Sequence, residues 1–245
     1  MRYVRGLLVA GLAWFAAGCM QFEYGIELED DLSGTASLDM EIDLERVAYM
    51  AAFIQNAFTG EGGEPSDEQI EEARQEILSE MDDEEDLSEA SLRAEIEPDL
   101  PEGVELVHAK VDRVDLLTTV DMQFAFDHVD KLKEIRLDDD DEGDEGGQVD
   151  TQPFENLQIT DDGDEIIIQS EPINPTEEMD DMSWLSDEMV EKLLEGFGIT
   201  FTIKTPFRIE EHNATKQEGS TLIWKFDIET LKSQEPVSIF ARFRR

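Results

Sequence analysis

Cysteine and histidine are the side chains here best suited to nucleophilic, acid–base or metal chemistry, and the chain has few of them. It contains one cysteine, Cys19, and three histidines, His108, His128 and His212. No histidine has a second histidine or a cysteine at the spacing of a zinc site. Each is therefore predicted to be a surface or strand histidine, and no metal site is predicted. Cys19 is left as the residue whose chemistry needs an explanation.

Acidic residues are so numerous that no pair stands out as a catalytic couple, since the chain holds 62 Asp and Glu. The run from Asp138 to Val149 begins like a calcium-binding loop, with Gly143 at its sixth position. Val149, however, stands where such a loop needs a bidentate glutamate, and Glu145 stands where an apolar residue is expected. The sequence also lacks the nucleophile-elbow, Walker and dinucleotide-binding patterns. We therefore predict a protein that is not an enzyme and needs no cofactor.

The residues before Cys19 have the layout of an export signal. Arg2 and Arg5 precede about a dozen mostly apolar residues, fewer than the ~20 that span a bilayer, and small residues follow at 16–18. The segment 15–19, Phe-Ala-Ala-Gly-Cys, resembles the lipobox of bacterial lipoproteins. The resemblance implies that residues 1–18 are a signal peptide that is removed, and that acyl chains such as palmitate are attached at Cys19. The alternative is an ordinary signal peptide followed by an unpaired cysteine.

Acylation at Cys19 would tether the protein to a membrane of the cell envelope. Several acyl chains anchor a protein stably, whereas one chain alone is marginal. Met20 stands where an aspartate, by analogy with the family, would favour retention in the inner membrane. If the cell has two membranes, we expect the outer one, with the protein facing the periplasm or the cell surface.

The length and the charge of the chain after the predicted signal peptide limit its organisation and its partners. Residues 19–245 are long enough for a substantial core and are predicted to form a single domain. The formal net charge of the full sequence, −43, argues against nucleic acid as a partner. Three explanations for the acids stay open: solubility in salty surroundings, binding of divalent cations, and docking to a basic partner. Their wide spread along the chain favours the first.

Hydrophobic periodicity predicts the elements of the first half. Alternation predicts a β-hairpin over 22–44 around an acidic turn, and two further strands over 104–111 and 116–126. The helical period predicts a largely apolar helix over 45–58, an amphipathic helix from a Ser66–Gln69 capping pattern to Met81, and a short helix over 88–96.

The second half is predicted to add more strands than helices. We expect a short helix over 129–135, a mobile acidic loop near 138–150, a hairpin over 157–168 and a helix that begins at Ser183 or Ser186. Alternating strands over 199–209, 222–228 and 237–243 are predicted to form consecutive antiparallel neighbours. Strands and helices do not alternate regularly, so the predicted fold class is α+β, with a curved antiparallel sheet of hairpins packed against several helices.

Residues near the C-terminus carry a second resemblance. The pair Thr205-Pro206, the segment 212–215 (His-Asn-Ala-Thr) and the segment 219–224 (Gly-Ser-Thr-Leu-Ile-Trp) are similar to the LppM-like domain of bacterial lipoproteins. The likeness in layout covers most of residues 19–243, and it implies an envelope function, with lipid or glycolipid binding in some relatives. Many relatives also carry a C-terminal membrane span, and none is predicted here. By their chemistry the motif residues suit structural roles, with Asn213 in a turn and Trp224 in a core.

These patterns together predict a non-catalytic envelope lipoprotein attached to a membrane through acylated Cys19. Its domain is expected to bind a lipid, a glycolipid or another amphipathic ligand between its helices and its sheet. The alternative is an envelope scaffold that binds a protein partner and no small-molecule ligand.

Overall fold

The structure is a computed structural model, and it describes residues 20–59, 64–83, 88–135, 154, 157–172, 196–233 and 236–245. Cys19, the signal peptide predicted at 1–18, the acidic loop near 138–150 and the helix expected after Ser183 or Ser186 lie outside the described residues.

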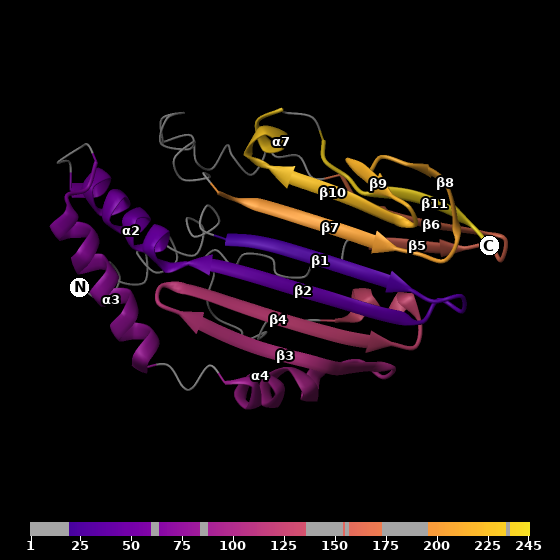
Figure 1. The fold of residues 1–245 in the computed structure, drawn as a ribbon, viewed down its shortest axis with the longest axis horizontal. Coiled ribbons are helices and arrows are strands. Elements are labelled where there is room, and N and C mark those ends of the chain that lie inside the picture. The colour runs from indigo at the N-terminus through magenta and orange to yellow at the C-terminus, as the bar shows by residue number, and fades with distance from the viewer. Residues whose placement is uncertain are drawn as a thin grey trace.

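Seven strands of the described chain form the larger sheet (Figure 1). In spatial order they are β3 (Val104–Val114), β4 (Leu117–Phe126), β2 (Gly34–Asp43), β1 (Met20–Leu28), β7 (Gly198–Lys204), β10 (Thr221–Asp227) and β9 (Lys216–Glu218). The hairpin predicted over 22–44 is confirmed as β1–β2, the two strands predicted over 104–111 and 116–126 are β3 and β4 and pair with each other, and β2 pairs with β4. The neighbours β1 and β7 are parallel, a pairing that the prediction of an antiparallel sheet did not include.

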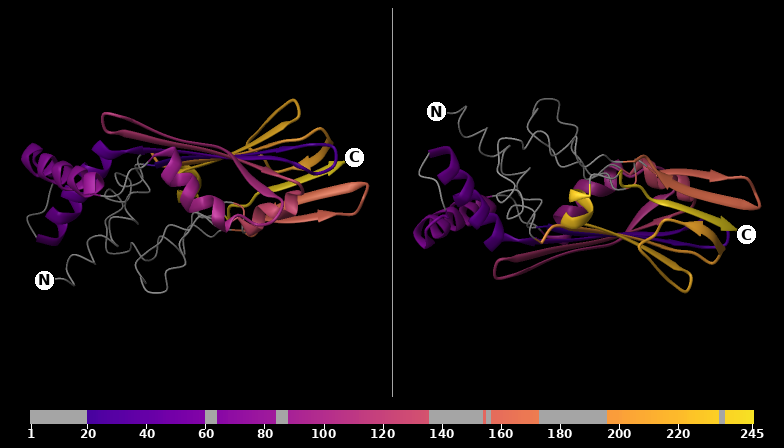
Figure 2. Two further views of the ribbon diagram at one scale, coloured as in Figure 1. Left: turned by 90° about the horizontal axis from the view of Figure 1, so that it is seen from below. Right: turned by 90° about the horizontal axis from the view of Figure 1, so that it is seen from above.

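A smaller sheet of four described strands lies over part of one face of the larger sheet (Figure 2). Its order is β5 (Leu157–Asp161), β6 (Glu165–Ser170), β11 (Phe240–Arg244) and β8 (Arg208–His212), all antiparallel. The hairpin predicted over 157–168 is confirmed as β5–β6, with Gly163 in the turn at a φ of +88°. The α+β class is confirmed, and the strands are divided between two sheets.

The prediction of one continuous strand over 199–209 is wrong. Its first part is β7 in the larger sheet, and its last part belongs to β8 in the smaller sheet. Pro206 has no N–H to give to a ladder, and the buried Thr205 side chain accepts a hydrogen bond from the Phe207 N–H at 3.1 Å. The chain therefore leaves one sheet at Thr205 and enters the other. The strand predicted to reach Ile228 also ends earlier, because Asp227 caps α7 (Ile228–Lys232).

Two helices follow β2 and pack against each other near one end of the larger sheet (Figure 1). They are α2 (Leu44–Thr59) and α3 (Asp67–Asp83), close to the predicted spans. Their contact consists mainly of small residues, with Ala48 and Ala52 of α2 buried against Ala73 of α3. The predicted capping box is confirmed, because Ser66 N–H donates to Gln69 Oε1 at 2.8 Å and Gln69 N–H donates to Ser66 Oγ at 3.4 Å.

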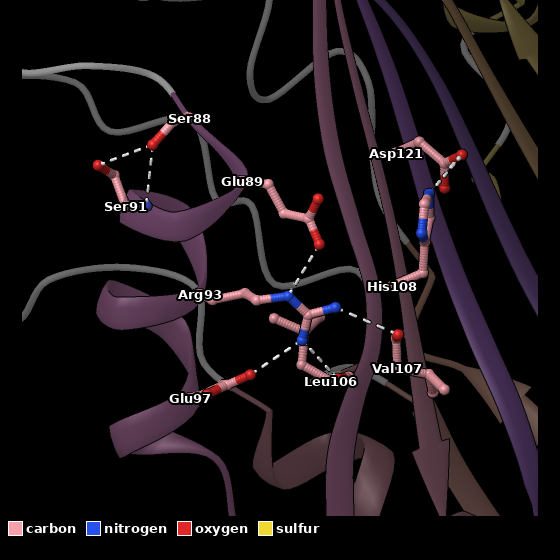
Figure 3. Close-up of polar contacts among 9 residues, drawn as sticks. All are labelled: Ser88, Glu89, Ser91, Arg93, Glu97, Leu106, Val107, His108 and Asp121. Carbon is pink, nitrogen blue, oxygen red and sulfur yellow. Dashed lines mark hydrogen bonds and ion pairs between the residues drawn. The ribbon is translucent and has the colours of Figure 1, made fainter.

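The predicted helix over 88–96 is confirmed as α4 (Glu89–Ile96), which is followed by the short 3₁₀ helix η2 (Glu97–Asp99). Ser88 caps α4 by accepting from the Ser91 N–H. Arg93 holds the helix to β3, because its guanidinium donates to the carbonyls of Leu106 at 3.0 Å and Val107 at 3.2 Å (Figure 3). The helix expected over 129–135 is a 3₁₀ helix, η3 (Val129–Glu134).

The main core lies between the two sheets. Its largest fully buried side chains include Trp224, Phe124, Phe154 and Phe243. Edge-to-face ring contacts continue from Tyr24 through Phe154 and Phe201 to Trp224. Among the helices that the structure describes, none has the length and apolar character needed to cross a membrane.

Candidate functional site

The strand register aligns six apolar side chains across the larger sheet. One comes from each of six neighbouring strands, and each lies opposite the next. We call them the apolar row: Val111, Val120, Met40, Phe22, Ile199 and Phe226. They share the face of the sheet that carries the core, because successive side chains of a strand alternate between faces and the core residues lie two positions away.

The apolar row is less covered than the row beside it. That neighbouring row, two residues along each strand, is Ala109, Met122, Leu38, Tyr24, Phe201 and Trp224, and all of these except Tyr24 are buried. In the apolar row only Phe22 is buried, and the other five side chains are half-buried. Phe154 contributes to the difference, because its ring covers Tyr24 and Phe201 at centroid distances of 6.2 and 6.5 Å.

A buried hydroxyl adjoins the apolar row. Thr118 lies on β4 two residues before Val120, so its side chain is on the same face of the sheet, and it is 3% exposed. Its Oγ1 has no hydrogen-bond partner among the described residues. A buried hydroxyl without a partner costs about 1–3 kcal/mol, so its retention calls for an explanation. Half-buried apolar side chains beside one free hydroxyl are suited to a molecule with a hydrocarbon part and a polar end.

The apolar row lies near the point where the predicted anchor would be attached. β1 begins at Met20, two residues before Phe22, and Met20 pairs with Ile42, which in turn pairs with Thr118. At ~3.4 Å per strand residue, the position of Cys19 is roughly 10 Å along the chain from Phe22. The structure thus places the apolar row and Thr118 at the end of the sheet where β1 begins, while Cys19 itself lies outside the described residues.

The opposite face of the larger sheet carries charged side chains. One row across it contains Lys110, Asp121, Asp39, Glu23, Thr200 and Lys225. Burial raises the pKa of the Asp39 carboxyl above its ordinary value, and the charges of Asp121 and Glu23 on either side raise this pKa further. Within the described part of the chain, no group of three or more His, Cys, Asp or Glu side chains is arranged to hold a metal ion.

The three histidines lie on separate elements. His108 in β3 contacts Asp121 on β4, with Nε2 and Oδ2 3.4 Å apart (Figure 3). His128 caps η3 by accepting from the Asp130 N–H, and His212 at the end of β8 contacts Gln217 at 3.2 Å. The side chains of all three are at least partly exposed, as predicted, and the structure does not bring them together.

The motif residues of the C-terminal region hold the two sheets together. Asn213 Oδ1 accepts from Trp224 Nε1 at 2.7 Å and from the Phe240 N–H at 2.8 Å, while its Nδ2 donates to the Ser238 carbonyl at 2.8 Å. Trp224 is buried in β10 of the larger sheet, whereas Phe240 begins β11 of the smaller sheet. The core position expected for Trp224 is confirmed, and Asn213 has a structural role, but its side chain bonds to Trp224, Ser238 and Phe240 and not within its own turn as expected.

The basic C-terminus contacts acids of its own domain. Arg245 makes a bidentate pair with Asp161 at 2.9 and 3.0 Å, and its guanidinium lies over the Phe207 ring at 5.8 Å. Bonds from the Gly163 N–H and from Arg245 lower the pKa of Asp161. Arg242 pairs with Glu211, and Arg244 pairs with Glu210. These arginines therefore stabilise the smaller sheet.

Sequence reasoning did not identify the apolar row or Thr118. Alternation in each strand correctly placed Phe22, Met40 and Val120 on apolar faces. Their alignment depends on the pairing of β2 with β4 and of β1 with β7, which joins distant segments and leaves no local signal.

Comparisons with known proteins show a distant likeness of fold. No protein-family model matches the chain, and no curated protein matches it significantly. One solved structure that it resembles is the NMR structure of the folded domain of LppM from Mycobacterium tuberculosis. The two share 10% sequence identity with a TM-score of 0.45, over 92% of this chain and 90% of that one. At this level the likeness is to a distant LppM-like fold and concerns the fold alone.

Proposed function

We propose that this protein is a non-catalytic lipoprotein of the bacterial envelope, anchored by acyl chains on Cys19, whose domain binds an amphipathic lipid along the apolar row. The observation that carries the ligand site is the combination of half-buried apolar side chains with the unpartnered buried hydroxyl of Thr118. The anchor rests on the lipobox-like segment that ends at Cys19.

The dimensions of the apolar row suit a hydrocarbon chain. It crosses six strands spaced ~4.8 Å apart, so it is roughly 24 Å long, compared with ~15 Å for half the hydrocarbon core of a bilayer. Each methylene moved from water to such a surface contributes about 0.8 kcal/mol. Thr118 lies at the anchor-side edge of the row and would bond to the polar end of the ligand.

The anchor is tested by metabolic labelling with a palmitate analogue in cells that express the full chain. We expect label on the unaltered protein, loss of label in Cys19→Ser, and release of that variant from the membrane fraction. Equal labelling of both proteins would contradict acylation at Cys19.

The ligand site is tested with a pyrene-labelled fatty acid and the purified Cys19→Ser chain, which carries no acyl chain of its own. Val120→Glu should weaken binding at least roughly tenfold, because a charge enters the apolar row. Thr119→Glu is the matched control, since Thr119 directly precedes Val120 in β4 and faces the opposite side. Equal binding by both variants, or no saturable binding by the parent, would refute the site.

Thr118→Val tests the contribution of the hydroxyl to binding independently of the apolar row. The two side chains have nearly the same shape, and removing a buried hydroxyl without a partner should leave the protein folded and at least as stable. We expect a several-fold loss of affinity for the fatty acid. Unchanged affinity would mean that Thr118 does not contact the polar end of the ligand.

An envelope scaffold without a small-molecule ligand is the second candidate. It is favoured by the well-filled core between the two sheets, where Phe154, Phe243 and Ile166 are almost fully buried. Native mass spectrometry and lipid extraction of the purified protein distinguish the two. A protein that carries no lipid and binds no fatty acid would favour the scaffold.

A further inference from the structure

The outer edge of β3 is unusually long for an unpaired edge. β3 (Val104–Val114) ends the larger sheet and has 11 residues, whereas the other terminal strands among the described residues have three (β9) or five (β5 and β8). A long free edge presents a row of backbone donors and acceptors that can pair with another strand, and natural proteins usually shorten or cover such edges.

Among the described residues, only the first part of this edge has hydrogen-bond partners outside the sheet. The strand has a bulge between Leu106 and His108, and the Arg93 guanidinium occupies the carbonyls of Leu106 and Val107 there (Figure 3). Residues 108–114 lie beyond the bulge and pair with β4 in regular antiparallel register. This second half of β3 is therefore the part of the edge that another strand can reach.

The β3–β4 turn indicates which backbone groups face outward. A two-residue turn, Asp115 and Leu116, joins Val114 to Leu117, which makes Val114–Leu117 a hydrogen-bonded pair. Hydrogen-bonded and non-hydrogen-bonded pairs then alternate along the hairpin. The N–H and C=O groups of Ala109, Val111 and Arg113 consequently point away from β4, and no described backbone group outside the sheet binds them.

We propose that residues 108–114 of β3 pair with the same residues of a second copy of this chain, antiparallel, about a two-fold axis at Val111. In this register Val111 lies opposite itself and Ala109 lies opposite Arg113, so all outward backbone groups form hydrogen bonds. Lys110 already pairs with Asp112 of its own strand, and in this register it also lies opposite Asp112 of the second copy, so that the two pairs meet with opposite charges facing each other. The segment is thus complementary in charge to its own copy.

Exposed apolar side chains support contact at this edge. Within the described residues, the exposed large hydrophobic side chains are Val107 (50% exposed), Val114 (67%) and Leu117 (37%), and all three belong to the β3–β4 hairpin. Of these, Val114 lies in the proposed segment, Val107 lies at the bulge and Leu117 lies on β4. In the proposed register Val114 packs against His108 of the second copy. The inference does not depend on the anchor or on the ligand site.

Cysteine cross-linking in the full chain tests the register. Val111→Cys places two thiols opposite each other across a pair whose Cα atoms are ~5.5 Å apart, within the range of a disulfide. Val114→Cys is the matched control, because Val114 is more exposed but lies opposite His108. We expect a disulfide-linked dimer on non-reducing gels for Val111→Cys and much less for Val114→Cys. The unaltered chain, run on the same gel, shows how much dimer forms through Cys19 alone.

Exchanging the charges of Lys110 and Asp112 tests whether the partner is a second copy of this chain. In sedimentation of the full chain in detergent and moderate salt, the unaltered protein should be a dimer, and Lys110→Asp or Asp112→Lys alone should lower the dimer fraction at least roughly tenfold by opposing like charges. The double variant with both substitutions should recover the dimer. A monomer in every salt concentration, equal cross-linking by both cysteine variants, or pairing of β3 with another protein would overturn the proposal.

Discussion

At the scale of single residues, Asn213 has the most consequential bonds. Its side chain accepts from Trp224 in the larger sheet and from Phe240 in the smaller sheet. Because the indole N–H of Trp224 is buried, it cannot turn to water if Asn213 is lost. The amide therefore contributes to both the position of Trp224 and the docking of the two sheets.

Asn213→Ala should lower the free energy of unfolding by about 2 kcal/mol, because one buried donor loses its acceptor. Urea unfolding followed by tryptophan fluorescence measures the change. Gln217→Ala is the control, since the exposed side chain of Gln217 bonds to His212 and the Gly219 carbonyl among the described residues, and a change under ~0.5 kcal/mol is expected. Equal effects of the two substitutions would show that the sheets do not depend on Asn213.

Asp39 makes stability depend on pH in a specific direction. Burial and the charges of Asp121 and Glu23 raise its pKa in the folded state, so the folded protein binds the proton more tightly than the unfolded chain does. The contribution of Asp39 to stability therefore falls as pH rises through its folded pKa, and ionised Asp39 destabilises the fold at neutral pH.

Asp39→Asn should raise the free energy of unfolding at pH 7 by on the order of 0.5 kcal/mol, after allowance for solvent screening. The gain should disappear below the ordinary pKa of aspartate, where both states are protonated. Glu41→Gln is the control, because Glu41 lies on the same face of β2 but opposite Gln21 and Thr119. A gain that persists at low pH would contradict the assignment to Asp39 ionisation.

At the scale of elements, the side chain of Arg93 makes hydrogen bonds that attach α4 to the sheet edge. Arg93 pairs with Glu89 in α4 and with Glu97 at the start of η2, and it donates to two backbone carbonyls at the β3 bulge. Both carboxylates raise the pKa of Arg93, which keeps the guanidinium charged. The rigid fork of arginine can reach both carbonyls at once, which a lysine ammonium cannot do.

Arg93→Lys should therefore loosen α4 while keeping the charge. Amide hydrogen exchange should become on the order of tenfold faster in residues 89–96 and remain unchanged in α3. Ser88→Ala provides a comparison, because it removes the N-cap of α4 but not its link to β3. If α4 exchanges at the original rate in Arg93→Lys, its attachment comes from Leu92 and Ile96, which also pack on the core.

Local patterns predicted the elements well, and distant pairing was the part that they could not supply. The hairpins over 22–44 and 157–168, the Ser66 capping box and the Ser88 helix followed from the spacing of apolar, turn and capping residues. The separation of β7 from β8 at Thr205 was missed, because alternation continues through Pro206 and hides the change of sheet. The apolar row was missed for a related reason, since its members meet only after β1 pairs with β7.

At the scale of the whole molecule, the excess of acid opposes compact folding. The chain carries 62 acidic and 19 basic residues, for a net charge of −43. Many of the basic side chains already have acidic partners, such as Arg245 with Asp161 and Lys204 with Glu27. Most acids must then repel one another, and two like charges 10 Å apart in water cost ~0.4 kcal/mol.

Salt should therefore stabilise the protein. Raising NaCl from 0.1 to 1 M shortens the screening length from ~10 to ~3 Å, and we expect the thermal midpoint to rise by roughly 5 °C or more. Calcium chloride at matched ionic strength separates screening from cation binding. Equal stabilisation by both salts fits a surface adapted to salty surroundings, whereas a saturable gain at micromolar calcium would favour specific cation sites. A midpoint that falls with salt would mean that the ion pairs, such as Arg245 with Asp161, outweigh the repulsion among the acids.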